Sequence, residues 1–327
     1  MTSATDRLAL VADIGGTNTR VALARGAIVE TGTVRRFRNA DHDGLAPLLS
    51  AYLADSSEGA GCTAACVAVA GPVRNGRGSL TNLDWTIDEE TLSRAAGADD
   101  VAILNDLQAQ GHALGRLAVD TVTPLVSTGD AAAAGDKLVI GVGTGFNAAA
   151  VHEEGLPRRL VTPSESGHAG LPVRDERMLR LARFVETAHG FPAIEDVLSG
   201  RGLERIHAWL SDEAGTRATH DSRAIIDDLA DRSDATATEA VRVFVRLLGE
   251  VAGDLALIHL PFGGIYLVGG MARAVAPVAQ EFGFAEAFHA KGRFAEFMQA
   301  FPVSLVEDDY AALTGCASHL AGRATTA

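Results

Sequence analysis

The sequence contains two copies of one pattern, in which an apolar run ends at a glycine-rich turn and a second apolar run follows. In the first copy, the run at residues 8–12 leads through Asp13 into the motif IGGTN. The second copy occupies residues 138–151, with Gly143-Thr144-Gly145 at its turn, and begins about 130 residues later. Because glycine allows a sharp turn, each copy predicts a hairpin of two strands. The repetition predicts an α/β protein of two related lobes with a ligand held between them.

Length and composition agree with two lobes. The chain has 327 residues and is 47% hydrophobic, which provides ample apolar material for a core. We place the small lobe at residues 1–116 plus 306–327 and the large lobe at residues 117–305. In each lobe we expect a mixed sheet flanked by helices.

A long helix is predicted in the large lobe. The string TATE at residues 236–239 has the form of a capping box, which satisfies the first free N–H groups of a helix. Apolar side chains then recur with helical spacing from Val241 to Ile258. That spacing indicates packing against a core and not a cofactor site.

The charge of the chain excludes some classes of partner. A net charge of -14 argues against nucleic acid and against an anionic membrane surface. No signal peptide opens the sequence, and no apolar run is long enough to span a bilayer. We therefore expect a soluble, cytoplasmic protein with no membrane or nucleic-acid partner.

Three cysteines, Cys62, Cys66 and Cys316, are too few for a disulfide framework or a four-cysteine zinc site. Their neighbours in the sequence are apolar or small. We expect all three to be buried thiols without chemistry of their own.

Asp106 is the candidate catalytic residue. It follows the apolar run 101–104 and Asn105, and it precedes a predicted helix at residues 107–114. A carboxylate at such a junction lies at the usual mouth of an α/β sheet and can take a proton from a substrate hydroxyl. The alternative is that Asp106 caps the following helix.

The turn of the first copy is the candidate phosphate site. The glycines of the IGGTN motif bring backbone N–H groups close to a ligand, and Thr17 can add a hydroxyl. Asp13 can hold a hydrated Mg²⁺. Gly269-Gly270 ends another apolar run, and small residues there allow a flat ring system to lie on the backbone. The alternative for the first turn is a plain hairpin.

Four polar side chains outside these turns could contact a ligand: Asn82, Glu165, His168 and Glu195. Three of them have a structural alternative. Asn82 can form a turn, His168 can be a structural histidine, and Glu195 can be an acid in the first turn of a helix.

Taken together and in order, these strings resemble those of the bacterial glucokinase family, and the match spans nearly the whole chain. The strings are Asp13-Ile14-Gly15-Gly16-Thr17-Asn18, Thr81-Asn82-x-x-Trp85, Asn105-Asp106, Gly143-Thr144-Gly145, Glu165-x-Gly167-His168, Glu195-x-Val197-Leu198-Ser199-Gly200 and Gly269-Gly270. The resemblance implies a two-lobed actin-like ATPase fold, related to ribonuclease H, with the active site in the cleft.

The resemblance also implies ATP-dependent phosphorylation of D-glucose at the 6-hydroxyl, which feeds glycolysis. Asp106 would be the general base and would also contact the sugar, together with Asn82, Asn105, Glu165, His168 and Glu195. ATP and Mg²⁺ would be held by Asp13 through water, and by Gly15, Gly16, Thr17, Asn18, Gly143, Thr144, Gly269 and Gly270. Closure of the lobes and a homodimer are further expectations from the family.

Some positions depart from the family pattern and leave alternatives open. Phe146-Asn147 follows the second turn where smaller residues are common, and Ser166 replaces a common glycine. A kinase for mannose, fructose or an amino sugar is therefore one alternative, and a non-catalytic sugar-binding regulator is another. Three scattered cysteines cannot supply the zinc motif of the related ROK sugar kinases.

Overall fold

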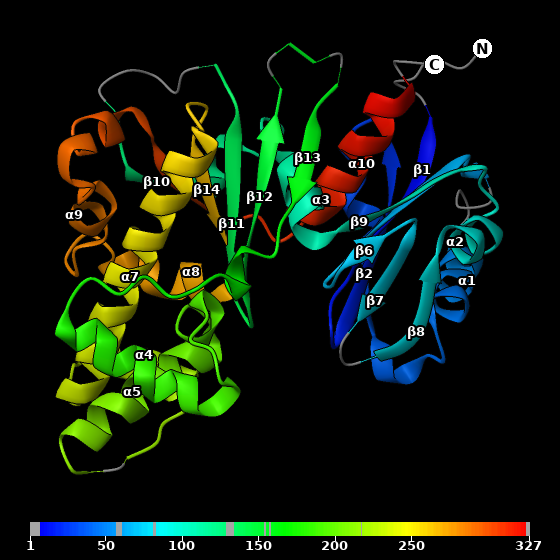
Figure 1. Cartoon of the computed structure of the whole chain (residues 1–327). Coiled ribbons are helices and arrows are strands. Elements are labelled where there is room, and N and C mark those ends of the chain that lie inside the picture. Colours follow the sequence, from blue (N-terminus) through cyan, green and yellow to red (C-terminus); the bar gives the residue numbers. More distant parts are fainter. Residues whose placement is uncertain are drawn as a thin grey trace. The chain divides into compact units, whose positions relative to one another are not determined.

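A computed structural model describes residues 7–56, 61–80, 83–128, 134–153, 155–156, 158–216 and 218–324 of this chain (Figure 1). The chain divides into two compact units. Unit 1 comprises Met1–Val119, Gly155–Pro163 and Asp308–Ala327, and unit 2 comprises Asp120–Glu154 and Ser164–Glu307.

Unit 1 is built on a mixed sheet with the strand order β3-β2-β1-β5-β9, in which β4 also pairs with β2 (Figure 1). Its strands are β1 (Leu8–Ile14), β2 (Asn18–Arg25), β3 (Ile28–Val29), β4 (Arg35–Arg38), β5 (Ala64–Val69) and β9 (Asp100–Asn105). β1 and β2 form the predicted antiparallel hairpin, whereas β1, β5 and β9 run parallel. The carboxyl ends of these three strands therefore lie at one edge of the sheet.

Alternate side chains of β1 enter two different apolar clusters, as expected for a strand buried on both faces. Leu10, Ala12 and Ile14 pack with one cluster, which includes residues of α1 (Leu45–Asp55) and α2 (Glu89–Ala96). Ala9 and Val11 pack with the other, which includes residues of α3 (Asp106–Ala113) and α10 (Ala311–Ala324). Both faces of the unit 1 sheet are thus covered by helices.

A close approach of α10 to α3 fixes the position of α3. A Cβ atom added at Gly315 would lie 1.7 Å from the carbonyl oxygen of Ala109, so only glycine fits at this crossing. The small antiparallel sheet β6-β7-β8 also belongs to this unit, with β6 at Val73–Arg74, β7 at Arg77–Leu80 and β8 at Leu83–Asp88.

The division of the chain departs from the expected one at residues 155–163, which we placed in the large lobe. This segment contains β13 (Leu160–Pro163) and packs with unit 1. Arg159 Nη1 donates hydrogen bonds to the carbonyl oxygens of Gly111 (3.2 Å) and His112 (2.8 Å), at the end of α3. These bonds join residues almost 50 positions apart, so no local pattern predicts them.

The sheet of unit 2 repeats the plan of unit 1 (Figure 1). The sheet has the strand order β10-β15-β14-β11-β12-β13. Besides β13, its strands are β10 (Val122–Val126), β11 (Lys137–Val142), β12 (Phe146–His152), β14 (Ile265–Val268) and β15 (Val303–Val306). β11 and β12 form the second predicted hairpin, and β11, β14 and β15 run parallel. The order β12-β11-β14-β15 matches β2-β1-β5-β9 in both sequence order and direction, which confirms the prediction of two related lobes.

Helices pack against this second sheet around one large apolar cluster that includes Phe244, Phe284 and Phe288. They are α4 (Glu176–His189), α5 (Gly200–Glu213), α6 (Ser222–Asp227), α7 (Ala235–His259), α8 (Gly270–Val275) and α9 (Phe284–His289). Short 3₁₀ helices of the chain are η1 (Thr31–Thr33), η2 (Asn39–Asp41), η4 (Val119–Thr121), η5 (Ser166–His168), η6 (Ile194–Asp196), η7 (Asp228–Ala230), η8 (Ala276–Val278), η9 (Gly292–Phe294) and η10 (Phe297–Ala300).

The start of α7 corrects one prediction. Asp234 is the N-cap, and its Oδ1 accepts hydrogen bonds from the N–H groups of Thr236 (2.7 Å) and Ala237 (3.2 Å). The predicted capping box at residues 236–239 is therefore wrong, because an aspartate two residues earlier already satisfies the first N–H groups.

Two further expectations can be compared with the fold. Cys62, Cys66 and Cys316 are buried and free, as predicted, and burial raises the pKa of the Cys62 thiol to about 11. Among the helices of the described residues, none combines the length and the apolar character that crossing a membrane requires.

Candidate active site

Asp106 lies at the junction that the sequence predicts, as the first residue of α3 directly after β9. Asn105 is the N-cap: its Oδ1 accepts a hydrogen bond from the N–H of Leu107 at 2.9 Å. The N–H of Asn105 donates in return to Oε1 of Gln108 at 3.1 Å, which completes a capping box. The capping role that we considered for Asp106 therefore belongs to Asn105.

The cap is anchored on both sides, which fixes the direction of the first turn of α3. Asn105 Nδ2 donates to the carbonyl oxygen of Gly71 at 3.0 Å, and Gln108 Nε2 donates to that of Val161 at 3.1 Å. Asp106 Oδ1 accepts from the N–H of Leu107 at 2.8 Å. The importance of Gln108 was not predicted, although the N-x-x-Q spacing was a readable signal.

The environment of Asp106 suits a general base. The pKa of its carboxyl group is raised from 3.8 to about 6: burial is the largest cause, the Leu107 N–H opposes it, and the charge of Asp13 adds to the rise. Burial also raises the pKa of Asp13, although Arg20 Nη1 lies 3.2 Å from Asp13 Oδ2 and opposes the shift. The parallel register β1–β5–β9 explains this coupling, because it places both carboxylates at one edge of the sheet.

The turn after Asp13 has a buried support and an exposed tip. The N–H of Gly15 donates to the carbonyl oxygen of Asn18 at 3.0 Å, while Gly16 and Thr17 are exposed. Asn39, which is buried, donates from Nδ2 to the carbonyl oxygen of Gly15 at 2.7 Å. An exposed glycine-rich tip on a rigid base can present backbone N–H groups to phosphate oxygens. Nothing in the sequence indicated Asn39.

In unit 2, Glu195 and the turn Gly143-Thr144-Gly145 lie together. Glu195 belongs to η6, and its Oε2 accepts a hydrogen bond from the N–H of Phe146 at 2.9 Å. A Cβ atom at Gly145 would lie 2.4 Å from that oxygen, so Gly145 has to be glycine for the carboxylate to reach the strand.

The loop that carries Glu165 and His168 is held by Asn147. Asn147 Oδ1 accepts hydrogen bonds from the N–H (3.0 Å) and the hydroxyl (3.2 Å) of Ser166, and its Nδ2 donates to Glu165 Oε2 at 3.2 Å. Glu165 and His168 remain exposed. A Cβ at Gly167 would lie only 2.0 Å from the carbonyl oxygen of Phe146, so the loop lies directly on β12. Asn147 is thus a positioning residue that we noted only as a departure from the family.

Gly269 and Gly270 come close to the same turn. Gly269 has a φ of +103°, and a Cβ on it would lie 2.4 Å from the carbonyl oxygen of Val142. A Cβ on Gly143 would lie 4.0 Å from the backbone nitrogen of Gly270. The two glycine-rich segments predicted to hold the nucleotide in this lobe are therefore neighbours in unit 2.

The predicted residues thus form one group in each unit. Unit 1 brings together Asp13, Gly15, Gly16, Thr17, Asn18, Asn105 and Asp106. Unit 2 brings together Gly143, Thr144, Glu165, His168, Glu195, Gly269 and Gly270. Asn82 lies outside the described residues.

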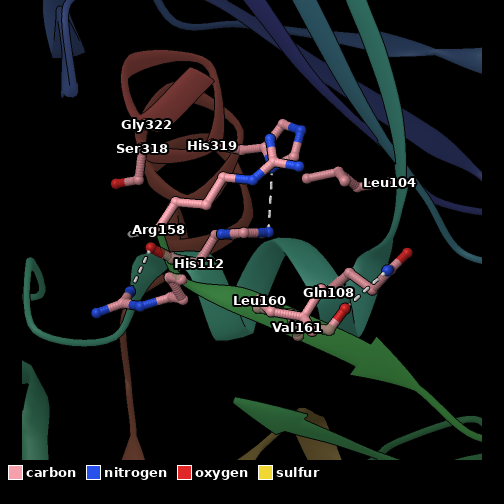
Figure 2. Close-up of a pocket in the computed structure, with 10 residues that line it drawn as sticks. Leu104, Gln108, His112, Arg158, Leu160, Val161, Ser318, His319 and Gly322 are labelled. Carbon is pink, nitrogen blue, oxygen red and sulfur yellow. Dashed lines mark hydrogen bonds between the residues drawn. The ribbon is translucent and has the colours of Figure 1, made fainter. Parts of the chain in front are cut away.

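Unit 1 also contains a cavity of about 150 Å³ beside α3 (Figure 2). Figure 2 shows His112 and His319 pointing toward each other across this cavity, and the Nε2 and Nδ1 atoms of the pair are 3.1 Å apart. Burial lowers the pKa of His112 to about 3 and that of His319 to about 4, so both rings are neutral. Gln108, the partner of Asn105 in the capping box, lines the cavity too, so the cavity lies next to the cap of α3.

Comparison with known proteins decides the family. The family model described as Glucokinase matches residues 10–323.

The chain belongs to the glucokinase family.

The glucokinase of Caulobacter sp. (strain K31) is 34% identical over 316 residues, which cover 95% of this chain and 94% of that protein. A solved glucokinase from an Antarctic psychrotroph has a TM-score of 0.85 and 29% identity, and the match covers 96% of this chain and 98% of that one. The glucokinase of Balamuthia mandrillaris, solved in complex with glucose, has a TM-score of 0.77 and 21% identity, with 98% and 95% coverage. The similarity to these glucokinase structures confirms the predicted actin-like ATPase fold.

Proposed function

We propose that this chain catalyses the ATP-dependent phosphorylation of D-glucose at its 6-hydroxyl, and that the glucose 6-phosphate formed enters glycolysis. The observation that carries the proposal is the state of Asp106, a buried carboxylate at the start of α3 with a pKa of about 6. Membership of the glucokinase family supports the reaction, and the glucose bound to the Balamuthia mandrillaris relative supports the substrate.

Asp106 would act as the general base. As the O6 atom forms its bond to the γ-phosphorus, the bond from that phosphorus to the bridging oxygen breaks and ADP leaves. The proton of the 6-hydroxyl passes to Asp106 Oδ2. With a pKa of about 6, about 90% of the carboxyl groups are ionised at pH 7 and can accept that proton. A pKa close to the working pH also favours return of the proton to solvent after each turnover.

The carboxylate oxygens of Asp13 and Asp106 are suitable ligands for a Mg²⁺ ion bound to ATP. Asp13 and Asp106 are two carboxylates whose negative charges disfavour each other, and hard oxygen ligands of this kind suit Mg²⁺. We propose that Asp13 holds the ion through water. When bound, Mg²⁺ would neutralise charge on the transferring phosphoryl group.

The glycine-rich segments of both units would bind the nucleotide. From unit 1 we assign Gly15, Gly16, Thr17 and Asn18 to the phosphates, and from unit 2 Gly143 and Thr144. Gly269 and Gly270 would lie against the adenosine, because a ring needs a backbone without side chains in its way.

The sugar hydroxyls would form hydrogen bonds with Asn82, Asn105, Glu165, His168 and Glu195. In Glu195 and Glu165 one carboxylate oxygen is already bonded to the protein, which orients the side chain. The second oxygen of each can accept a hydrogen bond from a hydroxyl. A sugar that lacks the matching hydroxyl would leave these acceptors unpaired, and this is a source of specificity.

We further propose that the enzyme acts in the cytoplasm as a homodimer. The family resemblance supports both statements. Light scattering coupled to size exclusion would measure the mass in solution, and a monomer at working concentration would contradict the dimer.

The decisive experiment is a coupled assay of Mg²⁺–ATP-dependent phosphorylation over glucose, mannose, fructose and glucosamine. Turnover that is highest with glucose supports the proposal. Preference for another sugar would retain the kinase and overturn the substrate. If the folded protein phosphorylates none of them, a sugar-binding regulator becomes the better explanation.

Asp106→Asn tests the role of the base in the same assay. General-base catalysis contributes about 10² to 10⁴ in rate, so kcat should fall by that factor while glucose binding, followed by calorimetry, persists. Asp88→Asn is the matched control, since Asp88 caps α2 in the same unit and asparagine is an equally good cap. A kcat of Asp106→Asn within a few-fold of the wild type would refute the assignment.

A further inference from the structure

His207 is a buried histidine whose two ring nitrogens lack a hydrogen bond. It lies on α5, its exposure is 0%, and neither ring nitrogen has a hydrogen-bond partner among the described residues. Leaving a buried polar group unpaired costs about 1–3 kcal/mol, so a side chain of this kind calls for a ligand. The phosphoryl-transfer site does not use His207.

Two further potential ligands face this ring. His220, in the exposed segment before α6, has its ring centroid 4.7 Å from that of His207. Asp234, the N-cap of α7, has its Oδ2 3.6 Å from His207 Nε2. One ligand atom from each of the three residues lies within 4.8 Å of the others.

We propose that His207, His220 and Asp234 form a binding site for a zinc ion. With metal–ligand distances of about 2.1 Å, neighbouring ligand atoms of a tetrahedral zinc site are about 3.4 Å apart. The 3.6 Å separation between Asp234 Oδ2 and His207 Nε2 is too long for a hydrogen bond but close to that spacing. His220 is exposed and belongs to a connecting segment, so it can move the short distance that a closed site requires.

The two oxygens of Asp234 allow it to serve two roles at once. Oδ1 accepts the hydrogen bonds of the α7 cap, which fixes the carboxylate and leaves Oδ2 directed at His207. The metal would thus be bound by an oriented ligand, in the way that outer hydrogen bonds orient metal ligands elsewhere.

The ligand types select the metal. Two imidazoles and one carboxylate suit zinc or a similar transition metal, whereas Mg²⁺ and Ca²⁺ prefer ligand sets made of oxygen. Water would complete the fourth position. The three ligands come from α5, the segment before α6 and the start of α7, so the ion would fasten a polar peripheral region to the core helices.

The test uses the full-length protein after dialysis against a chelator. Titration with Zn²⁺ should show one site per chain and raise Tm, and Co²⁺ should give the intense visible absorption of a tetrahedral site. His220→Gln removes the exposed ligand, and Asp234→Asn removes the anionic oxygen while keeping a good helix cap. Each variant should weaken Zn²⁺ binding at least tenfold.

His189→Gln is the matched control. His189 Nε2 also lies 3.6 Å from a carboxylate, that of Asp196, but Arg205 already occupies that carboxylate. This variant should bind Zn²⁺ as the wild type does. Absence of a 1:1 site in the wild type would overturn the proposal, and so would unchanged affinity in His220→Gln and Asp234→Asn. Neither result depends on kinase activity.

Discussion

Asp106→Asn should make the protein more stable as it makes it inactive, and the gain should depend on pH. Burial raises the pKa of Asp106 from 3.8 to about 6. At 1.36 kcal/mol per pH unit, keeping this carboxylate ionised in the fold costs about 3 kcal/mol. Asparagine has a similar shape and avoids this cost.

The sign follows from proton binding. Between about pH 4 and pH 6 the folded protein holds a proton on Asp106 that the unfolded chain has lost, so wild-type stability falls as pH rises through this window and then levels off. From pH 5 to pH 8 the stability advantage of Asp106→Asn should therefore grow by about 1.4 kcal/mol. The other titrating groups are common to both proteins and largely cancel in the difference.

Thermal unfolding of both proteins at pH 5 and pH 8 measures this change. For a chain of 327 residues, an increase of about 1.4 kcal/mol corresponds to about 2 °C in the difference between the two Tm values. Asp88→Asn provides the contrast: hydrogen bonds from Thr91 lower the pKa of Asp88 below 3.8, so this group titrates below pH 5 and the Tm difference of the variant should hardly change from pH 5 to pH 8. A Tm difference between Asp106→Asn and wild type that is constant with pH, or that shrinks from pH 5 to pH 8, would refute the reasoning.

Three other substitutions test how the site is supported. Gly315→Ala would place a Cβ 1.7 Å from a carbonyl oxygen of α3, so it should lower the free energy of unfolding by about 1–3 kcal/mol. Gly322→Ala is the control on the same helix, because a Cβ there has no atom within 4 Å, and it should be neutral or slightly stabilising. Denaturant titration measures both changes. Asn147→Ala should raise KM for glucose about two- to tenfold, because Glu165 loses the hydrogen bond that orients it, and should also lower Tm, because Ser166 loses its acceptor; an unchanged KM would contradict the first expectation. Asn39→Ala should lower unfolding free energy by about 1–3 kcal/mol and raise KM for ATP, and a change in Tm alone would limit its role to folding.

The sequence predicted what local patterns control. Apolar runs and glycines are sufficient to place both hairpins, and the residue types around Asp106 place it between a strand and a helix. Two local signals compete at the start of α7. Asp234 is the residue that caps the helix, and it lies two positions before the threonine of the predicted capping box.

The supporting contacts could not be predicted in this way, because they join residues far apart in the chain. Asn39 bonds a carbonyl 24 positions away, and Gln108 bonds one 53 positions away. An asparagine or glutamine carries no signal of such a partner until the fold brings the two together. The bonds of Arg159 to the end of α3 could not be predicted for the same reason, since these partners are distant in sequence.

The division of tasks between Asn105 and Asp106 has a consequence for how this fold can evolve. Asn105 closes the helix, and in the proposed mechanism the adjacent Asp106 would accept the proton. A change at position 106 can therefore remove activity without removing the cap on which α3 depends. On the proposed roles, a descendant that loses the base would keep the folded scaffold, and that scaffold could still bind the sugar.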